Sequence, residues 1–269
     1  MLVKALASWL EEVSHGDPIY TALVASLFAA LMTSLGSMLI LFIRNPSRVE
    51  RSSVLLDIGM AFSSGVMTVA SFTSLLLPAI DMAGIITPLT GFILGAVAIY
   101  ILNSILPHEH LIKGYEGPQW GMRKVMSAWL VAVAIIIHNI PEGMAIGASS
   151  TYDPGEGIVV GIAIGLQDLP EGLSVSLPIA VATGRKGLAL LVGVLSGLSE
   201  VLTGFITALL GSAAVSLLPL LLGFGAGAMM YVVSHEALPE SHRTGHENKA
   251  TIGFFLGFIV MLYLDSTLG

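Results

Sequence analysis

Two hexapeptides decide how this chain folds: HNIPEG at residues 138–143 and QDLPEG at residues 167–172. Both follow one template, polar-polar-apolar-Pro-Glu-Gly, and each lies deep inside an apolar run long enough to cross a bilayer. Polar and ionisable side chains at that depth are costly, so a functional role is their default interpretation. We therefore interpret the rest of the chain as the scaffold that holds this polar cluster inside a membrane.

The composition is that of an integral membrane protein. Of the 269 residues, 55% are hydrophobic and only 11% are charged, whereas a soluble domain carries about 25% charged residues. The absence of cysteine excludes disulfides and thiolate metal sites, and no basic patch supports a nucleic-acid partner. Residues 1–17 are expected to form a short amphipathic lead-in at the membrane interface. Residues 18–269 are expected to form a single transmembrane domain.

Eight apolar runs predict an all-α, polytopic membrane protein with eight transmembrane helices. Each run is close to the length that a helix needs to cross the hydrocarbon layer. Pro78 is expected to stop the second helix, and Pro239 follows the seventh. The expected spans are 18–43, 53–77, 86–106, 122–149, 157–182, 187–210, 216–238 and 250–264.

The basic residues predict the orientation of these spans. Lys4 is the only one in the segments on one side of the predicted membrane. The loops on the other side carry Arg44, Arg48, Arg51, Lys113, Arg123, Lys124, Arg185, Lys186, Arg243 and Lys249. Because short cytoplasmic loops are enriched in Lys and Arg, both termini are expected outside.

Each hexapeptide places metal-ligand types on one helix face. In the first copy, His138 and Asn139 lie four and three residues before Glu142, and such pairs are neighbours on a helix. The second copy repeats this spacing with Gln167, Asp168 and Glu171. The proline of each copy frees a backbone carbonyl, which a membrane tolerates where the backbone lines a cavity. Imidazole, carboxylate and amide oxygen together suit a borderline divalent cation.

Other spans contribute further candidates. Glu200 lies in the middle of the sixth span, so four interior acids have no Lys or Arg nearby and must bind protons or cations. Met67 lies in the middle of the second span, where a lone methionine is usually core filler. Asp57 fits either an interfacial cap at the start of that span or part of a pathway.

With these motifs the chain resembles the ZIP family of divalent-metal transporters, and most closely its bacterial and archaeal branch. The resemblance covers nearly the whole chain and extends to Met67, Glu200 and residues 234–240. It implies a binuclear site at the bilayer midplane that takes two divalent ions as transported substrate, without an organic cofactor. Its first position would use Met67, His138, Glu142, Gln167 and Glu171. Its second position would use Asn139, Glu142, Asp168, Glu171 and Glu200.

The same resemblance implies a transport pathway. Asp57, Asp81 and Asp265 match acidic positions near the family's path, and His235, Glu236 and Glu240 match its cytoplasmic end. His108 and His110 resemble a short histidine stretch in the loop after the third span, which would be a cytoplasmic loop metal site; the alternative is a solvated loop end with incidental histidines. The family further implies the cell (inner) membrane as location, the lipid bilayer and divalent ions as partners, and a homodimer.

One departure from the family concerns selectivity. Many members carry histidine where Gln167 stands, so the first position is harder and poorer in nitrogen here. We expect import of zinc foremost, with cadmium, iron and manganese as further candidate substrates.

Two other classes of function remain as alternatives. An intramembrane metalloenzyme would use paired histidines and acids to activate a water. However, the chain has no His-Glu-x-x-His pattern, so we expect no enzyme. A proton-coupled carrier of a small organic solute is the second alternative, and the acid cluster without Lys or Arg argues against an anionic substrate.

Overall fold

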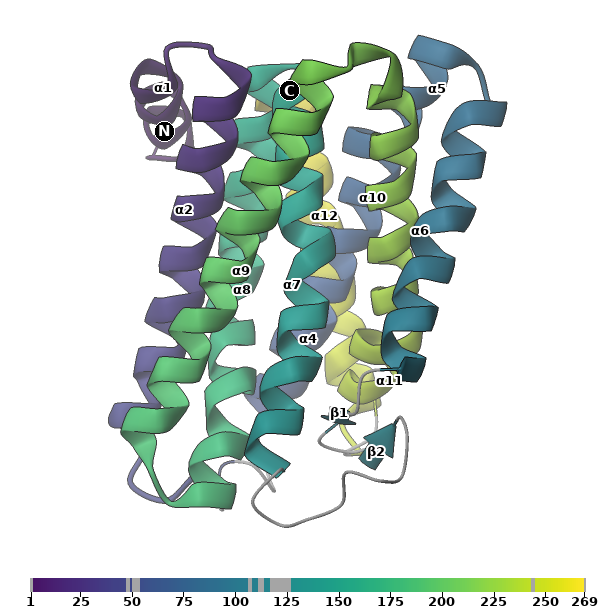
Figure 1. The fold of residues 1–269 in the computed structure, drawn as a ribbon. Coiled ribbons are helices and arrows are strands. Elements are labelled where there is room, and N and C mark those ends of the chain that lie inside the picture. The colour runs from purple at the N-terminus through teal and green to yellow at the C-terminus, as the bar shows by residue number, and fades with distance from the viewer. Residues whose placement is uncertain are drawn as a thin grey trace.

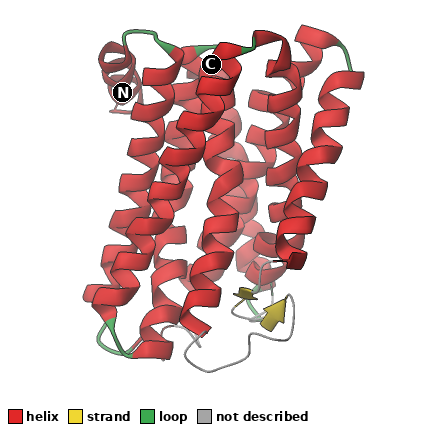
Figure 2. Cartoon of the chain, viewed as in Figure 1, coloured by secondary structure: helices red, strands yellow, loops and turns green. Residues whose placement is uncertain are grey.

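The fold is known from a computed structural model that describes residues 2–46, 49, 54–105, 108–110, 114–116, 127–242 and 245–268. Long helices run side by side between two ends of the molecule, and the first and last helices both finish at the same end (Figures 1 and 2). The predicted all-α class is confirmed for the bundle. Strands β1 (His108–His110) and β2 (Gly114–Glu116) form one small antiparallel hairpin at the opposite end.

The helical elements follow the predicted spans closely. Those before the hairpin are α1 (Leu2–Ser14), α2 (Pro18–Met38), η1 (Leu39–Leu41), α4 (Val54–Ala70), η2 (Ser71–Leu76), α5 (Leu77–Ala83) and α6 (Ile86–Ile105). Those after it are α7 (Ser127–Tyr152), α8 (Pro154–Thr183), α9 (Lys186–Ala213), η4 (Val215–Leu217), α10 (Leu218–Val232), η5 (Val233–Ala237), α11 (Leu238–Ser241) and α12 (Glu247–Leu268).

In the described part of the chain, seven helical segments are long and apolar enough to cross a bilayer. They are Pro18–Leu41, Val54–Ala83, Ile86–Ile105, Pro154–Val181, Lys186–Ala213, Val215–Ser241 and Glu247–Leu268. Helix α7 carries the first hexapeptide and is not among them, and the side chains of residues 127–136 lie outside the described part of the structure. That α7 also crosses the membrane, which would make eight spans in all, therefore stays a prediction.

Aspartate–proline pairs explain where two of these helices begin. The carboxylate of Asp17 accepts hydrogen bonds from the amides of Ile19 and Tyr20, both at 2.9 Å, at the start of α2. Asp153 caps α8 in the same way. An aspartate satisfies amides that have no partner in the first turn, and the following proline has the backbone angle that a helix needs there.

The predicted helix ends at Pro78 and Pro239 are wrong. The second span continues through Pro78 to Ala83, and the seventh continues through Pro239 to Ser241. A π-helical turn, η2 or η5, precedes each of these prolines. The ring of a proline in a helix clashes with the backbone carbonyl four residues earlier, so that carbonyl loses its helical hydrogen bond. A π turn shifts the hydrogen bonds to five residues, so the ring is accommodated without ending the helix.

Glycines bring pairs of helices to backbone contact. Helix α4 packs mainly on α12, and α6 packs mainly on α10, while α2, α7, α8 and α9 pack on one another. A Cβ atom added to Gly95 of α6 would overlap the carbonyl oxygen of Phe224 in α10. One added to Gly227 of α10 would overlap the carbonyl oxygen of Phe92 in α6. Such close approach is typical of helix packing in lipid.

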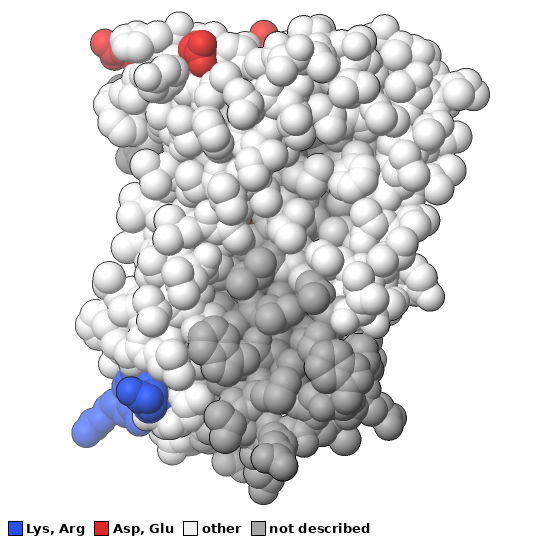
Figure 3. All heavy atoms as spheres, viewed as in Figure 1, with Lys and Arg blue, Asp and Glu red and all other residues white. Residues whose placement is uncertain are grey.

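The surface agrees with a membrane orientation. Large apolar side chains such as Leu202, Phe255 and Tyr263 are exposed on the flanks. On the face shown in Figure 3, Lys and Arg gather at the end opposite the termini, and Asp and Glu gather at the termini's end. Lys186 donates hydrogen bonds to the carbonyls of Leu41 (3.1 Å) and Ile43 (2.6 Å) at the basic end. Six further basic residues used to predict the orientation lie outside the described residues: Arg48, Arg51, Lys113, Arg123, Lys124 and Arg243.

Helix α1 packs against the end of the bundle where the chain begins. Leu10 is buried against Ile158 and Ile162 of α8, whereas Trp9 is 56% exposed. One face of α1 is therefore covered by the bundle, whereas the side chain of Trp9 is exposed. The division of the chain into a lead-in and one transmembrane domain stays a prediction.

Candidate metal site

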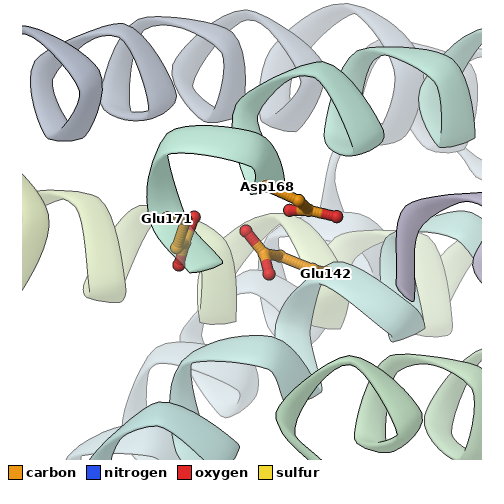
Figure 4. A group of neighbouring side chains, drawn as sticks. All are labelled: Glu142, Asp168 and Glu171. Carbon is orange, nitrogen blue, oxygen red and sulfur yellow. The ribbon is translucent and has the colours of Figure 1, made fainter. Parts of the chain in front are cut away.

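The two hexapeptides face each other inside the bundle. Helices α7 and α8 both continue through their internal prolines, Pro141 and Pro170. Glu142 of α7 and Asp168 and Glu171 of α8 are buried, and they turn their carboxylates toward a common space (Figure 4). One oxygen from each of the three lies within 4.8 Å of the others. Carboxylates at these separations suit a cation between them, because metal–oxygen bonds are about 2.0–2.6 Å long.

One side of this space is completed by Glu200 of α9. Its Oε1 accepts a hydrogen bond from the side-chain amide of Asn139 and another from Thr33 Oγ1, at 3.2 Å. The side-chain amide of Gln167 donates to Glu142 Oε1. The carboxylates of Glu142 and Glu200 are both fully buried. In each of them, one oxygen is held by an amide or a hydroxyl of a neighbouring helix.

The other side of the space contains His138 and Met67. His138 Nε2 lies 3.4 Å from Glu171 Oε1. Ser63 Oγ donates to Glu171 Oε2 at 3.1 Å and lies 3.9 Å from the sulfur of Met67. The imidazole of His138 on α7 therefore approaches Glu171 directly, and the thioether of Met67 on α4 lies next to the Ser63 hydroxyl that contacts Glu171.

The structure thus brings together the eight residues that we define as the candidate metal site. They are Met67, His138, Asn139, Glu142, Gln167, Asp168, Glu171 and Glu200. Their roles as ligands stay a prediction, since the structure contains only the protein chain.

The acidic groups of the candidate metal site outnumber its basic groups, and several of its oxygens accept no hydrogen bond from the described residues. No Lys or Arg in the described part of the chain pairs with its carboxylates, and His138 is the basic group at hand. Five of its buried oxygens accept no hydrogen bond from the described residues: Asn139 Oδ1, Glu142 Oε2, Gln167 Oε1, Asp168 Oδ2 and Glu200 Oε2. Buried acceptors without partners are costly and rare. Bound cations would supply the partners that these oxygens lack.

Sequence analysis missed three polar residues next to the candidate metal site. Thr33 contacts Glu200, Ser63 contacts Glu171, and Asn103 of α6 contacts Glu236. Hydroxyls in membrane helices commonly bond to their own backbone, as Thr33 also does with the Ala29 carbonyl at 3.1 Å. Thr33 and Ser63 are therefore not distinguished from many similar residues by sequence, and Asn103 is distinguished only as an amide within an apolar span.

Two of the acids expected near the transport path, Asp265 and Asp81, differ in their surroundings. Asp265 Oδ1 accepts a hydrogen bond from Ser74 Oγ at 2.9 Å, near the end of the bundle that holds the termini. Asp81 is exposed on α5, and the structure does not bring it to the candidate metal site.

Asp57, expected as a cap or near the path, lies on α4, and the residues expected at the cytoplasmic end lie on η5 and α11. Asp57 is buried and pairs with His246 Nδ1 at 2.8 Å. The ring of His235 lies on Tyr231, with 5.0 Å between ring centroids, and Glu240 is half-buried. Glu236 is buried and contacts His138 directly. The side chains of His108 and His110 in β1 lie outside the described part of the structure.

Comparison with known proteins gives one consistent family. The sequence profile of a family described as ZIP Zinc transporter matches residues 108–265. Zinc transporter ZIPB of Bordetella bronchiseptica is 40% identical over 90% of this chain and 79% of its own length. Zinc transporter GufA of Myxococcus xanthus is 36% identical over 92% of this chain and 98% of its own. Zinc transporter ZupT of Stenotrophomonas maltophilia is 28% identical over 90% and 93%.

Proposed function

Because this chain belongs to the ZIP zinc transporter family, we propose that it carries divalent metal cations, zinc foremost, across a membrane. The relatives are named transporters, which confirms the prediction that the chain is not an enzyme. Its long apolar helices make it a multi-pass membrane protein.

The observation that best supports this function is the set of unpartnered oxygens at the candidate metal site. The five oxygens belong to side chains that are at most 2% exposed, and no described Lys or Arg lies beside them. A carrier of anions would need basic groups here. A carrier of divalent cations needs this arrangement, because carboxylate, amide oxygen and imidazole are ligands for such ions.

We propose further that the candidate metal site holds two ions as substrate. The first would be held by Met67, His138, Glu142, Gln167 and Glu171. The second would be held by Asn139, Glu142, Asp168, Glu171 and Glu200. Glu142 and Glu171 would bridge both, and their position between the His138 side and the Glu200 side supports this assignment.

The proposed direction is import through the cell (inner) membrane, with eight spans and both termini outside. The shared end of the first and last helices and the basic side chains at the opposite end support this orientation. A homodimer is an expectation from the family resemblance alone, and the mass of the purified protein in detergent would test it.

The experiment is uptake of radioactive zinc into proteoliposomes along a zinc gradient. Uptake should exceed that of empty liposomes, and Glu142→Ala should reduce it to the empty level. Equal uptake by protein-containing and empty liposomes would contradict the proposal. A proton flux that does not depend on metal would instead favour the organic-solute carrier.

A further inference from the structure

His138 makes two contacts through its two ring nitrogens, and only one of them reaches the candidate metal site. Nε2 lies 3.4 Å from Glu171, while Nδ1 lies 3.2 Å from Oε2 of Glu236 on η5. His138 is 9% exposed and Glu236 is 4% exposed. A carboxylate accepts hydrogen bonds, so this contact calls for a hydrogen on Nδ1. Nε2 is the nitrogen directed at Glu171, and it is the one that a cation would bind once it carries no hydrogen.

Glu236 is itself held from the other side by Asn103. The side-chain amide of Asn103 donates to Glu236 Oε1 at 2.7 Å, and Asn103 is 4% exposed. The two oxygens of Glu236 thus serve two different partners, the amide from α6 and the imidazole from α7. A carboxylate bound at both oxygens has little freedom to rotate away from His138.

The backbone around this chain of contacts is arranged to fix it. Glu236 lies on the π-helical turn η5, just before Leu238-Pro239, and π turns redirect side chains at functional sites. Asn103 lies on α6, which is packed against α10 at backbone distance through Gly95 and Gly227. Helix α10 leads directly into η5, so the close packing of α6 on α10 helps to set the distance between Asn103 and Glu236.

We propose that Asn103 and Glu236 are positioning residues for His138, which hold its Nε2 toward the carboxylates and thereby favour zinc and cadmium over manganese at the candidate metal site. The inference rests on the proposed function, because a preference requires a cation to be bound there. Imidazole nitrogen favours zinc, whereas carboxylate and amide oxygens suit harder ions such as manganese. A histidine whose other nitrogen is held by a carboxylate is also a better-oriented ligand.

The test breaks the chain of contacts at two different links. Asn103→Leu removes the donor to Glu236 at similar volume, and Glu236→Gln replaces the acceptor with an amide of nearly the same shape. Ser104→Ala and Ser234→Ala are matched controls. They lie within two positions of the two residues on the same elements, and their exposed hydroxyls bond to backbone carbonyls within their own helical turns.

The first measurement is NMR of ¹¹³Cd²⁺ bound to detergent-solubilised protein with ¹⁵N-labelled histidine. The wild-type protein should show coupling of cadmium to the Nε2 atom of His138, identified by its loss in His138→Gln. Both test variants should lose this coupling or move it to Nδ1. Both controls should keep it.

The second measurement compares zinc and manganese in equilibrium binding and in competition uptake. Asn103→Leu and Glu236→Gln should each weaken zinc binding about tenfold or more. They should change manganese binding by less than about twofold. Unchanged Nε2 coupling and an unchanged zinc-to-manganese ratio in either folded variant would overturn the inference. An equal loss of both ions would also overturn it, because Glu236 would then act as a ligand on the path.

Failure of the proposed function would look different. Wild-type protein that binds cadmium through His138 but takes up no zinc into liposomes would reject transport. The NMR comparison would still decide the roles of Asn103 and Glu236. If one variant unfolds, the other still breaks the chain of contacts at its own link.

Discussion

Most of the potential metal-ligand atoms at the candidate metal site are oxygens. They differ in whether a hydrogen bond already holds them. Glu142 and Glu200 each have one oxygen engaged by an amide and one that accepts no hydrogen bond from the described residues. The engaged oxygen fixes the orientation of the carboxylate, and the other is left for a cation. This division predicts that single substitutions will differ in how many ions they remove.

Glu142 should matter more for bound metal than Asn139. Glu142 is proposed to touch both ions, whereas Asn139 would touch one and also donates to Glu200. Glu142→Ala should therefore weaken binding at both positions and retain less metal, whereas Asn139→Ala should keep the ion of the first position. Metal content of purified protein, measured by mass spectrometry after equilibration with zinc, checks this. If both variants retain the same amount of metal, the bridging role of Glu142 is wrong.

Gln167 should limit the preference for zinc. An amide is a poorer zinc ligand than imidazole, so Gln167→His should raise the zinc-to-manganese uptake ratio. A change of about tenfold would correspond to about 1.4 kcal/mol. Gln167→Asn controls for loss of the hydrogen bond to Glu142, because it keeps the amide but shortens it. An unchanged ratio in Gln167→His would contradict the prediction.

At the scale of helices, glycine contacts set the separation of α6 and α10. Gly95→Ala should lower the free energy of unfolding by about 1–3 kcal/mol, because the added methyl group meets the backbone of Phe224 and Ala228. Gly187→Ala is the matched control, since its added Cβ would have nothing within 4 Å. Thermal unfolding in detergent measures both. Equal midpoints for the two variants would show that α6 can move away from α10 at little cost.

The sequence was more informative about some helix starts than about helix ends. The first span was expected from residue 18, and α2 begins at Pro18, because a proline in the first turn acts locally. The span expected from residue 157 instead begins at Pro154, where Asp153 caps α8. Pro78 and Pro239 were misread, because a π turn beside a proline has no known local sequence signal and depends on packing around it. The same limit applies to the candidate metal site. Spacing and family resemblance named its eight residues, but the contact of Asn103 with Glu236 joins residues 133 positions apart.

At the scale of the whole molecule, charged side chains are distributed unevenly on the face shown in Figure 3. On the face in Figure 3 the acidic side chains lie at the end with both termini, and the basic ones lie at the other. Cytoplasmic loops are enriched in Lys and Arg. The arrangement predicts a definite orientation, and it also requires α7 to cross the membrane so that the chain returns to the side on which it began.

The absence of cysteine makes this orientation directly measurable, because any introduced cysteine is the only thiol in the chain. His15, Tyr152 and Thr267 are exposed at or near the termini's end, and Arg185 and Lys249 are exposed in predicted cytoplasmic loops. In intact cells, a membrane-impermeant maleimide should label His15→Cys, Tyr152→Cys and Thr267→Cys. It should label Arg185→Cys and Lys249→Cys only after the membrane is permeabilised. Labelling of Thr267→Cys without His15→Cys would mean an odd number of spans. Labelling of Arg185→Cys in intact cells would mean the opposite orientation.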